Sequence, residues 1–183
     1  AVMGSKKLKA IAVDRSRKRP SFKDLPRLRE IGNWFTEEKK RNRPESFNWG
    51  TLTSTVEQGA AGELPVKNYT TNKYDISPED MAKYGHEYIR GNFEPKPDPC
   101  WACQSHHCHT MRVTEGRYKG EKIEEPEAES FRAWGSTTGH TEVATTMVLA
   151  NDVDRWGVDT NEAGYLMGMV MECYEKGIIN RED

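Results

Sequence analysis

The stretch Cys100-Trp-Ala-Cys103-Gln-Ser-His-His-Cys108 holds three of the chain's four cysteines. Three of the five histidines lie in it or directly beside it: His106, His107 and His109. Such a density of thiols and imidazoles is typical of a metal or iron–sulfur site. A purely structural role, in which these residues bind no metal, is the less favoured alternative. The site is the feature around which we interpret the rest of the chain.

The cysteine spacing by itself leaves the metal open. Cys100 and Cys103 form a C-x2-C pair, and Cys108 follows after a gap of four residues. Thiolates at this spacing can bind one zinc ion or two corners of a [4Fe–4S] cluster. Zinc would take further ligands from Cys108 and the adjacent histidines, whereas a cubane cluster needs a fourth ligand. The fourth cysteine, Cys173, falls in the apolar stripe of a predicted helix, so we assign it to the core.

Size and composition limit the class of protein. The 183 residues suffice for one or two domains, but only 35% are hydrophobic and 31% are charged. This thin supply for a core is compatible with a loop-rich globular piece or with a segment of a longer polypeptide. The ends of the chain, which lacks a Met start and stops soon after a predicted helix, favour the segment. The net charge of -2 gives no global electrostatic case for nucleic acid, and no apolar run approaches a membrane span. Closely spaced thiols without a disulfide framework favour a reducing, cytoplasmic setting.

The apolar periodicity predicts a mainly α fold. We expect strands at residues 10–13 and 110–115, and helices at residues 22–41, 52–61, 77–89, 127–134, 141–156 and 159–176. Two helices carry stripes that we expect to be buried. The first comprises Leu25, Leu28, Ile31, Trp34 and Phe35, and the second comprises Tyr165, Leu166, Met169, Val170, Cys173 and Tyr174. Gly135 is expected to break the helix that contains it.

Two further constellations have ordinary explanations. In Asp154-Arg-Trp-Gly157-Val-Asp159, both carboxylates could accept hydrogen bonds from a ligand. Gly157 as a helix C-cap and Asp159 as an N-cap explain the same residues without a ligand, and this interpretation is favoured on physical grounds. Glu129 and His140 flank a Gly-rich turn and could do acid–base chemistry, although a solvated glutamate is commoner.

Taken in order, these stretches resemble the tungsten-dependent aldehyde ferredoxin oxidoreductase family. The opening AVMGSKKLKAIAV is similar to the end of that family's pterin-binding domain, and the three cysteines are similar to its cluster motif, with one extra residue in the second gap. The segment PEAES resembles P-E-[YF]-E, and residues 154–159 match D-x-x-G-[LV]-D. The likeness is weakest across residues 20–80. The family's E-x-x-H pair is not recognisable here.

The resemblance implies a helical middle domain preceded by the last strand of a β-rich pterin-binding domain, with residues 1–20 and 21–183 as the two parts. It implies that Cys100, Cys103 and Cys108 hold three corners of a [4Fe–4S] cluster, whose fourth ligand lies outside this chain. The other implied cofactor is a tungsten or molybdenum bis-pterin, bound by Asp154, Gly157 and Asp159. A Mg²⁺ that bridges the pterin phosphates is implied near the backbone of Ala1.

The implied activity is oxidation of an aldehyde to a carboxylic acid, with electrons passing through the cluster to ferredoxin or an iron–sulfur partner subunit. Glu129 would transfer protons. The histidines beside Cys108 and the WGSTTGH segment ending at His140 also resemble the branch that contains the tungsten subunit of class II benzoyl-CoA reductase, in which His140 would be a proton donor. We expect an oligomer that includes the rest of its own polypeptide. A zinc-stabilised binding module is the alternative of another class.

Overall fold

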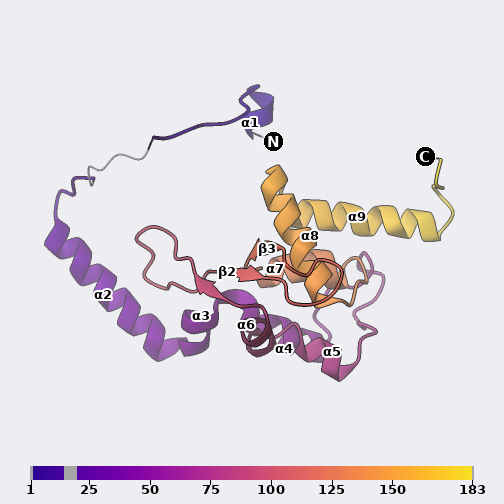
Figure 1. The fold of residues 1–183 in the computed structure, drawn as a ribbon, viewed down its shortest axis with the longest axis horizontal. Coiled ribbons are helices and arrows are strands. Elements are labelled where there is room, and N and C mark those ends of the chain that lie inside the picture. The colour runs from indigo at the N-terminus through magenta and orange to yellow at the C-terminus, as the bar shows by residue number, and fades with distance from the viewer. Residues whose placement is uncertain (1, 15–19, 183) are drawn as a thin grey trace. The chain divides into compact units, whose positions relative to one another are not determined.

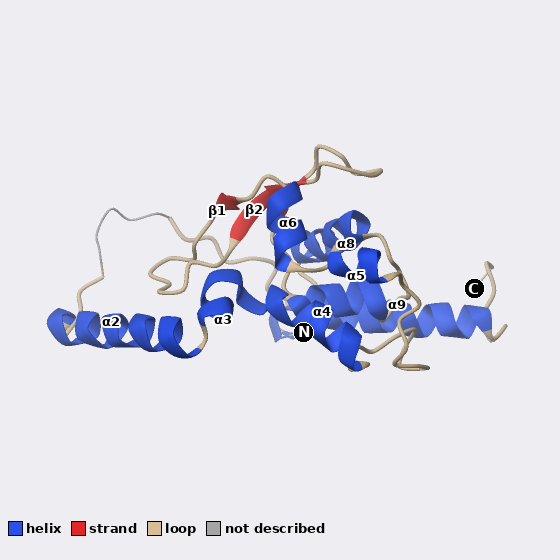
Figure 2. Cartoon of the chain, turned by 90° about the horizontal axis from the view of Figure 1, so that it is seen from below, coloured by secondary structure: helices blue, strands red, loops and turns tan. Residues whose placement is uncertain are grey.

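The structure, a computed structural model, describes residues 2–14 and 20–182. It divides into two compact units, residues 1–34 and 35–183, which we describe separately. Helices are the main regular elements of both units, and three short strands lie in the second (Figures 1 and 2). The predicted mainly α fold is confirmed. The domain boundary expected at residue 20 stays a prediction.

The first unit contains α1 (Val2–Ser5) and the beginning of α2 (Leu25–Asn42). The helix predicted at residues 22–41 is therefore confirmed. The strand predicted at residues 10–13 is wrong: these residues form no regular element, and the described part of the first unit contains no strand with which they could pair. The prediction that the α2 stripe is buried is also wrong. Its side chains are exposed, and 62% of the surface of Trp34 is accessible. Ala1 lies outside the described residues.

The second unit begins with short helical pieces. After α2 come α3 (Pro44–Trp49), the 3₁₀ turn η1 (Gly50–Thr53) and α4 (Ser54–Ala61), which confirms most of the helix predicted at residues 52–61. The helix predicted at residues 77–89 is two helices, α5 (Pro78–Ala82) and α6 (His86–Asn92). Gly85 separates them with an extended backbone. The predicted start is confirmed, because the Ser77 side chain accepts a hydrogen bond from the Asp80 N–H at 3.0 Å.

A three-stranded antiparallel sheet frames the cysteine stretch. It consists of β1 (Lys96–Pro97), β2 (His109–Arg112) and β3 (Lys122–Glu124), in the order β1-β2-β3. Pro97 pairs with His109, and Met111 pairs with Ile123. The cysteines therefore lie in the loop that connects two paired strands. The strand predicted at residues 110–115 is confirmed in its first half and ends at Arg112.

The helical part that follows is more continuous than predicted. The helix α7 (Ala128–Phe131) runs directly into the π-helical turn η2 (Arg132–Ser136), so Gly135 does not break the helix. Gly135 is instead a point of close packing, where an added Cβ would meet the Tyr84 ring at 3.3 Å. The last two helices are α8 (Val143–Trp156) and α9 (Thr160–Glu175). Each of their boundaries lies within two residues of the predicted one.

The core joins the sheet to α6, α7 and α8 through buried side chains that include Ile89, Phe93, Met111, Phe131 and Met147. The helix α9 packs differently from the prediction: its buried residues are Gly164 and Gly168, while Leu166, Met169, Val170 and Tyr174 of the expected stripe are exposed. Two glycines let α9 approach η2 more closely than an apolar stripe would allow. In the described part of the chain, no helix is long and apolar enough to cross a membrane.

Candidate metal centre

The loop that carries the cysteines is tightly bent. The Cys103 N–H donates to the Cys100 carbonyl at 3.1 Å, which closes a turn between the first two thiols. Ala102 and His106 both have left-handed backbones, with φ of 57° and 46°. Such conformations are uncommon for residues other than glycine and are found where the surroundings fix the backbone. The sequence signal at this place was the cysteine spacing alone, and the two bends could not be seen in it.

The three thiols have different environments. Hydrogen bonds from the backbone N–H groups of Ser105 and His106 lower the pKa of the Cys103 thiol, and the Ser105 N–H lies 3.4 Å from its sulfur. Burial, reinforced by the neighbouring Cys100, raises the pKa of Cys108 to about 11. Cys100 itself is exposed. The structure thus brings Cys100 and Cys108 together. Cys103 instead interacts with Ser105 and His106 and does not belong to the close donor group around Cys108. The role of the three cysteines as ligands stays a prediction.

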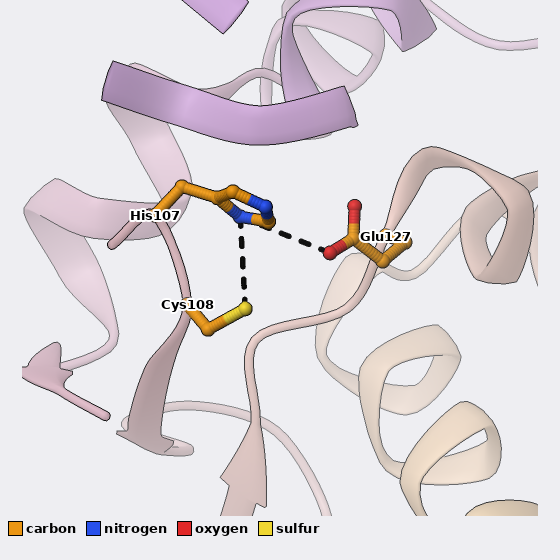
Figure 3. A group of neighbouring side chains, drawn as sticks. All are labelled: His107, Cys108 and Glu127. Carbon is orange, nitrogen blue, oxygen red and sulfur yellow. Dashed lines mark hydrogen bonds and ion pairs between the residues drawn. The ribbon is translucent and has the colours of Figure 1, made fainter. Parts of the chain in front are cut away.

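A mixed donor group surrounds Cys108 (Figure 3). His107 Nδ1 lies 3.7 Å from the Cys108 sulfur and 3.9 Å from Glu127 Oε1, and the three donor atoms lie within 4.8 Å of one another. The Glu127 carboxylate also accepts a hydrogen bond from the Thr51 hydroxyl. Such an N, S and O set could bind a single divalent cation. Sequence reasoning missed Glu127, because it lies 19 residues beyond Cys108 in a segment singled out for Glu129.

Gly50 explains why the His107 ring can lie in this position. An added Cβ at Gly50 would meet His107 Nδ1 at 2.6 Å, and Gly50 has a φ of +62°. Both the close approach and the left-handed backbone require glycine here. The turn η1 therefore forms one wall of the centre. The other two histidines of the stretch differ from His107, since His109 faces Glu125 at 2.9 Å and His106 lies at a bend.

The Asp154–Asp159 turn has the caps that its sequence predicts. Gly157 is a left-handed C-cap whose N–H donates to the Asp154 carbonyl at 3.0 Å, and Asp159 accepts from the Glu162 N–H at 2.9 Å. Burial, and then the nearby Asp159 charge, raises the pKa of Asp154. The Asp154 carboxylate has no hydrogen bond within the described residues, so it is free to accept one from a ligand N–H group.

Glu129 and His140 lie in different surroundings. Glu129 is 46% exposed and forms an ion pair with Arg132 at 2.9 Å. His140 has a buried Nε2 without a hydrogen-bond partner among the described residues, while its carbonyl accepts from the hydroxyls of Tyr74 and Tyr84. No hydrogen bond joins Glu129 to His140 in this part of the chain. A buried, unsatisfied imidazole nitrogen is costly and fits a site that receives a ligand.

Comparison with known proteins decides the family. Residues 28–183 match the family described as "Aldehyde ferredoxin oxidoreductase, domains 2 & 3". The chain belongs to the aldehyde ferredoxin oxidoreductase family. The predicted resemblance is confirmed, and the match to two domains of that family agrees with the mainly helical fold.

Curated relatives extend this result over the whole chain. The chain is 32% identical to the tungsten-containing aldehyde ferredoxin oxidoreductase of Pyrococcus furiosus and 29% identical to that of Thermococcus kodakarensis. It is also 28% identical to the aliphatic sulfonate oxidoreductase, WOR-like subunit, of Pyrococcus furiosus. Each comparison covers 100% of this chain but 29% of the relative, so the chain spans less than a third of their length.

The residues present fit the cofactors that such a family implies. Three thiols on one bent loop are the donor type that an iron–sulfur cluster requires, and two of them, Cys100 and Cys108, lie together in this structure. Cys173 is half-buried in α9 and does not belong to this loop. The Asp154 carboxylate is exposed and makes no hydrogen bond to the described residues, so it is accessible to a ligand that presents N–H groups, as a pterin does.

Proposed function

We propose that the chain is part of a tungsten-bis-pterin oxidoreductase that passes electrons through a [4Fe–4S] cluster. The observation that carries the proposal is the bent loop of Cys100, Cys103 and Cys108 in a chain that belongs to the aldehyde ferredoxin oxidoreductase family. When bound, a tungsten or molybdenum bis-pterin would supply two-electron redox chemistry. A cluster beside it can pass those electrons on one at a time.

The residues of this chain would hold both groups. Cys100, Cys103 and Cys108 would bind three irons, and the fourth ligand would come from outside the chain. Asp154, Gly157 and Asp159 would bind the pterin. The Asp154 carboxylate has no hydrogen bond to any described residue, whereas Asp159 would have to share its carboxylate with the α9 cap. A Mg²⁺ site near Ala1 belongs to the proposal but lies outside the described residues.

The reaction that we propose converts an aldehyde and water into a carboxylic acid, two protons and two electrons. Glu129 would accept a proton, and its exposed carboxylate beside Arg132 can do so without leaving a buried charge. Ferredoxin or an iron–sulfur partner subunit would accept the electrons, a proposal supported by the names of the relatives. All four cysteines are unpaired, which suits the reducing cytoplasm, and an oligomer completes the proposal.

Metal analysis of the full-length protein, purified without oxygen, tests this function. We expect tungsten or molybdenum together with about four irons per cluster. Cys103→Ala should abolish the iron signal, whereas Cys173→Ala, the matched control on α9, should leave it intact. Zinc in place of tungsten and iron would contradict the proposal. It would favour a zinc-stabilised binding module, for which the His107, Cys108 and Glu127 group offers the ligands.

A second candidate substrate is an aromatic acyl-CoA whose ring is reduced, as in class II benzoyl-CoA reductase. The buried and unpartnered Nε2 of His140 favours it, because a histidine in that state could donate a proton to a reduced ring. Assays of the full-length enzyme with a viologen dye, using an aldehyde or an aromatic acyl-CoA, separate the two. If the enzyme turned over the aromatic acyl-CoA and not the aldehyde, reduction of the acyl-CoA would take the place of aldehyde oxidation as the proposed reaction.

A further inference from the structure

A buried ion pair lies behind the cysteine loop. Arg90 of α6 donates from Nε to Glu125 Oε1 at 2.7 Å and from Nη2 to Glu125 Oε2 at 3.1 Å. Their side chains are only 12% and 4% exposed. Burying two charges costs several kcal/mol per ion, and the mutual attraction often does no more than offset it. The ion pair therefore contributes little net stability, and its role is to hold the groups that Arg90 and Glu125 contact.

Arg90 uses its remaining donors on backbone carbonyls. Nη2 also donates to the His107 carbonyl at 2.7 Å, and Nη1 donates to the Asn48 carbonyl at 2.7 Å. The guanidinium lies over the Trp49 ring, 4.8 Å from its centroid. Only a planar, forked cation can make these contacts at once, so lysine cannot replace arginine here. Through Arg90, the helices α3 and α6 are tied to the residue that precedes Cys108.

Glu125 fixes the residue on the other side of Cys108. The Glu125 backbone N–H donates to the His109 carbonyl at 2.8 Å, and Glu125 Oε2 lies 2.9 Å from His109 Nδ1. The Cys108 carbonyl itself accepts from the Asp98 N–H at 3.0 Å. Three consecutive carbonyls, from His107 to His109, are thus each held by a different partner. These bonds restrain the Cys108 backbone at the residue itself and on both sides.

The first cysteine of the loop is held much less firmly. Cys100 is exposed, and its carbonyl receives a hydrogen bond from within the same loop. We infer that Arg90 and Glu125 are positioning residues that preorganise Cys108 as the anchoring ligand of the metal centre. The inference rests on the proposed cluster and adds two residues outside the cysteine stretch. Groups that orient metal ligands typically change metal affinity 10–100-fold when they are replaced.

The test uses the full-length protein, purified without oxygen. Arg90→Lys keeps the charge but loses the fork, and Glu125→Gln keeps the shape but loses the charge and one acceptor. We expect both variants to retain at most half of the wild-type iron, and the remaining cluster to show a shifted reduction potential in a titration followed by electron paramagnetic resonance. Arg117→Lys is the matched control, because Arg117 is exposed and contacts only the Tyr118 ring among the described residues. It should change neither quantity.

Wild-type iron content and potential in both variants would overturn the inference. A wild-type protein that contains no iron would instead overturn the proposed function, and the inference with it. If the Arg90→Lys variant does not fold, amide hydrogen exchange in the full-length Glu125→Gln apoprotein tests the inference instead. Faster exchange at the amides of Asp98 and Glu125, which donate to the Cys108 and His109 carbonyls, with unchanged exchange in α8 would support the inference. Unchanged exchange at both places would refute it.

Discussion

Gly164 of α9 lies so close to Ala133 that an added Cβ would meet the Ala133 Cβ at 2.6 Å. One turn later, a Cβ on Gly168 would meet the Thr137 carbonyl oxygen at 3.0 Å. These two glycines allow α9 to lie against η2 by its backbone. The larger apolar side chains of α9 consequently lie on its exposed faces.

Gly164→Ala should destabilise the full-length protein by about 1–3 kcal/mol, the usual cost of forcing extra volume into a packed contact. The measurement is the midpoint of denaturant-induced unfolding. Gly91→Ala is the matched control, because no atom lies within 4 Å of an added Cβ there and the residue is helical. It should be neutral or stabilising by about 0.5–1 kcal/mol. Equal effects of the two changes would show that the close contact does not exist.

Asp159 combines an observed cap with a proposed pterin contact, and two substitutions separate these roles. Asp159→Ala should cost about 1 kcal/mol of stability through loss of the bond to the Glu162 N–H. Asp159→Asn should keep the cap and change the stability by only a few tenths of a kcal/mol. Both should lower the pterin content of the purified protein. A normal pterin content in the Asn variant would leave Asp159 with the cap alone.

Glu129→Gln should retain tungsten and iron but lower turnover by roughly 10²-fold, as expected for the loss of a proton-transfer group. Metal analysis and steady-state assay of the full-length enzyme give both numbers. Arg132→Gln breaks the same ion pair while keeping the carboxylate, and such an exposed pair contributes only about 0–1 kcal/mol. The Arg132 variant should therefore lose much less activity. Similar losses would assign Glu129 a structural role.

The two thiols Cys103 and Cys108 should react at different pH in the apoprotein. A lowered pKa means that Cys103 forms the reactive thiolate at a lower pH than an ordinary thiol, whereas Cys108, with a pKa of about 11, stays protonated well above pH 9. Alkylation by iodoacetamide at pH 8, measured on peptides by mass spectrometry, should modify Cys103 first. The Cys108 rate should continue to rise towards pH 11. Faster alkylation of Cys108 at pH 8 would contradict the environments described here.

Local features could be predicted from sequence because their partners lie within a few residues. The Ser77 and Asp159 caps each involve an N–H three positions away, and Gly157 ends α8 through its own left-handed backbone. The three clustered cysteines likewise lie in one loop, between β1 and β2, because they are close together in the sequence. Periodicity found the helices for the same reason, although it could not show that Gly85 divides one of them.

The partners of those elements were decided by tertiary structure. Hydrophobic periodicity marks an apolar face of a helix but carries no information about what covers it, so the α2 stripe and most of the α9 stripe proved exposed in this chain. Glu127 reaches His107, and Arg90 reaches Glu125, across 20 and 35 residues of sequence. Such contacts depend on how β2, β3 and α6 meet. The sequence alone determined the caps, the family likeness and which residue types are candidate ligands. Packing decided which side chains surround Cys108, because long-range contacts have no local pattern.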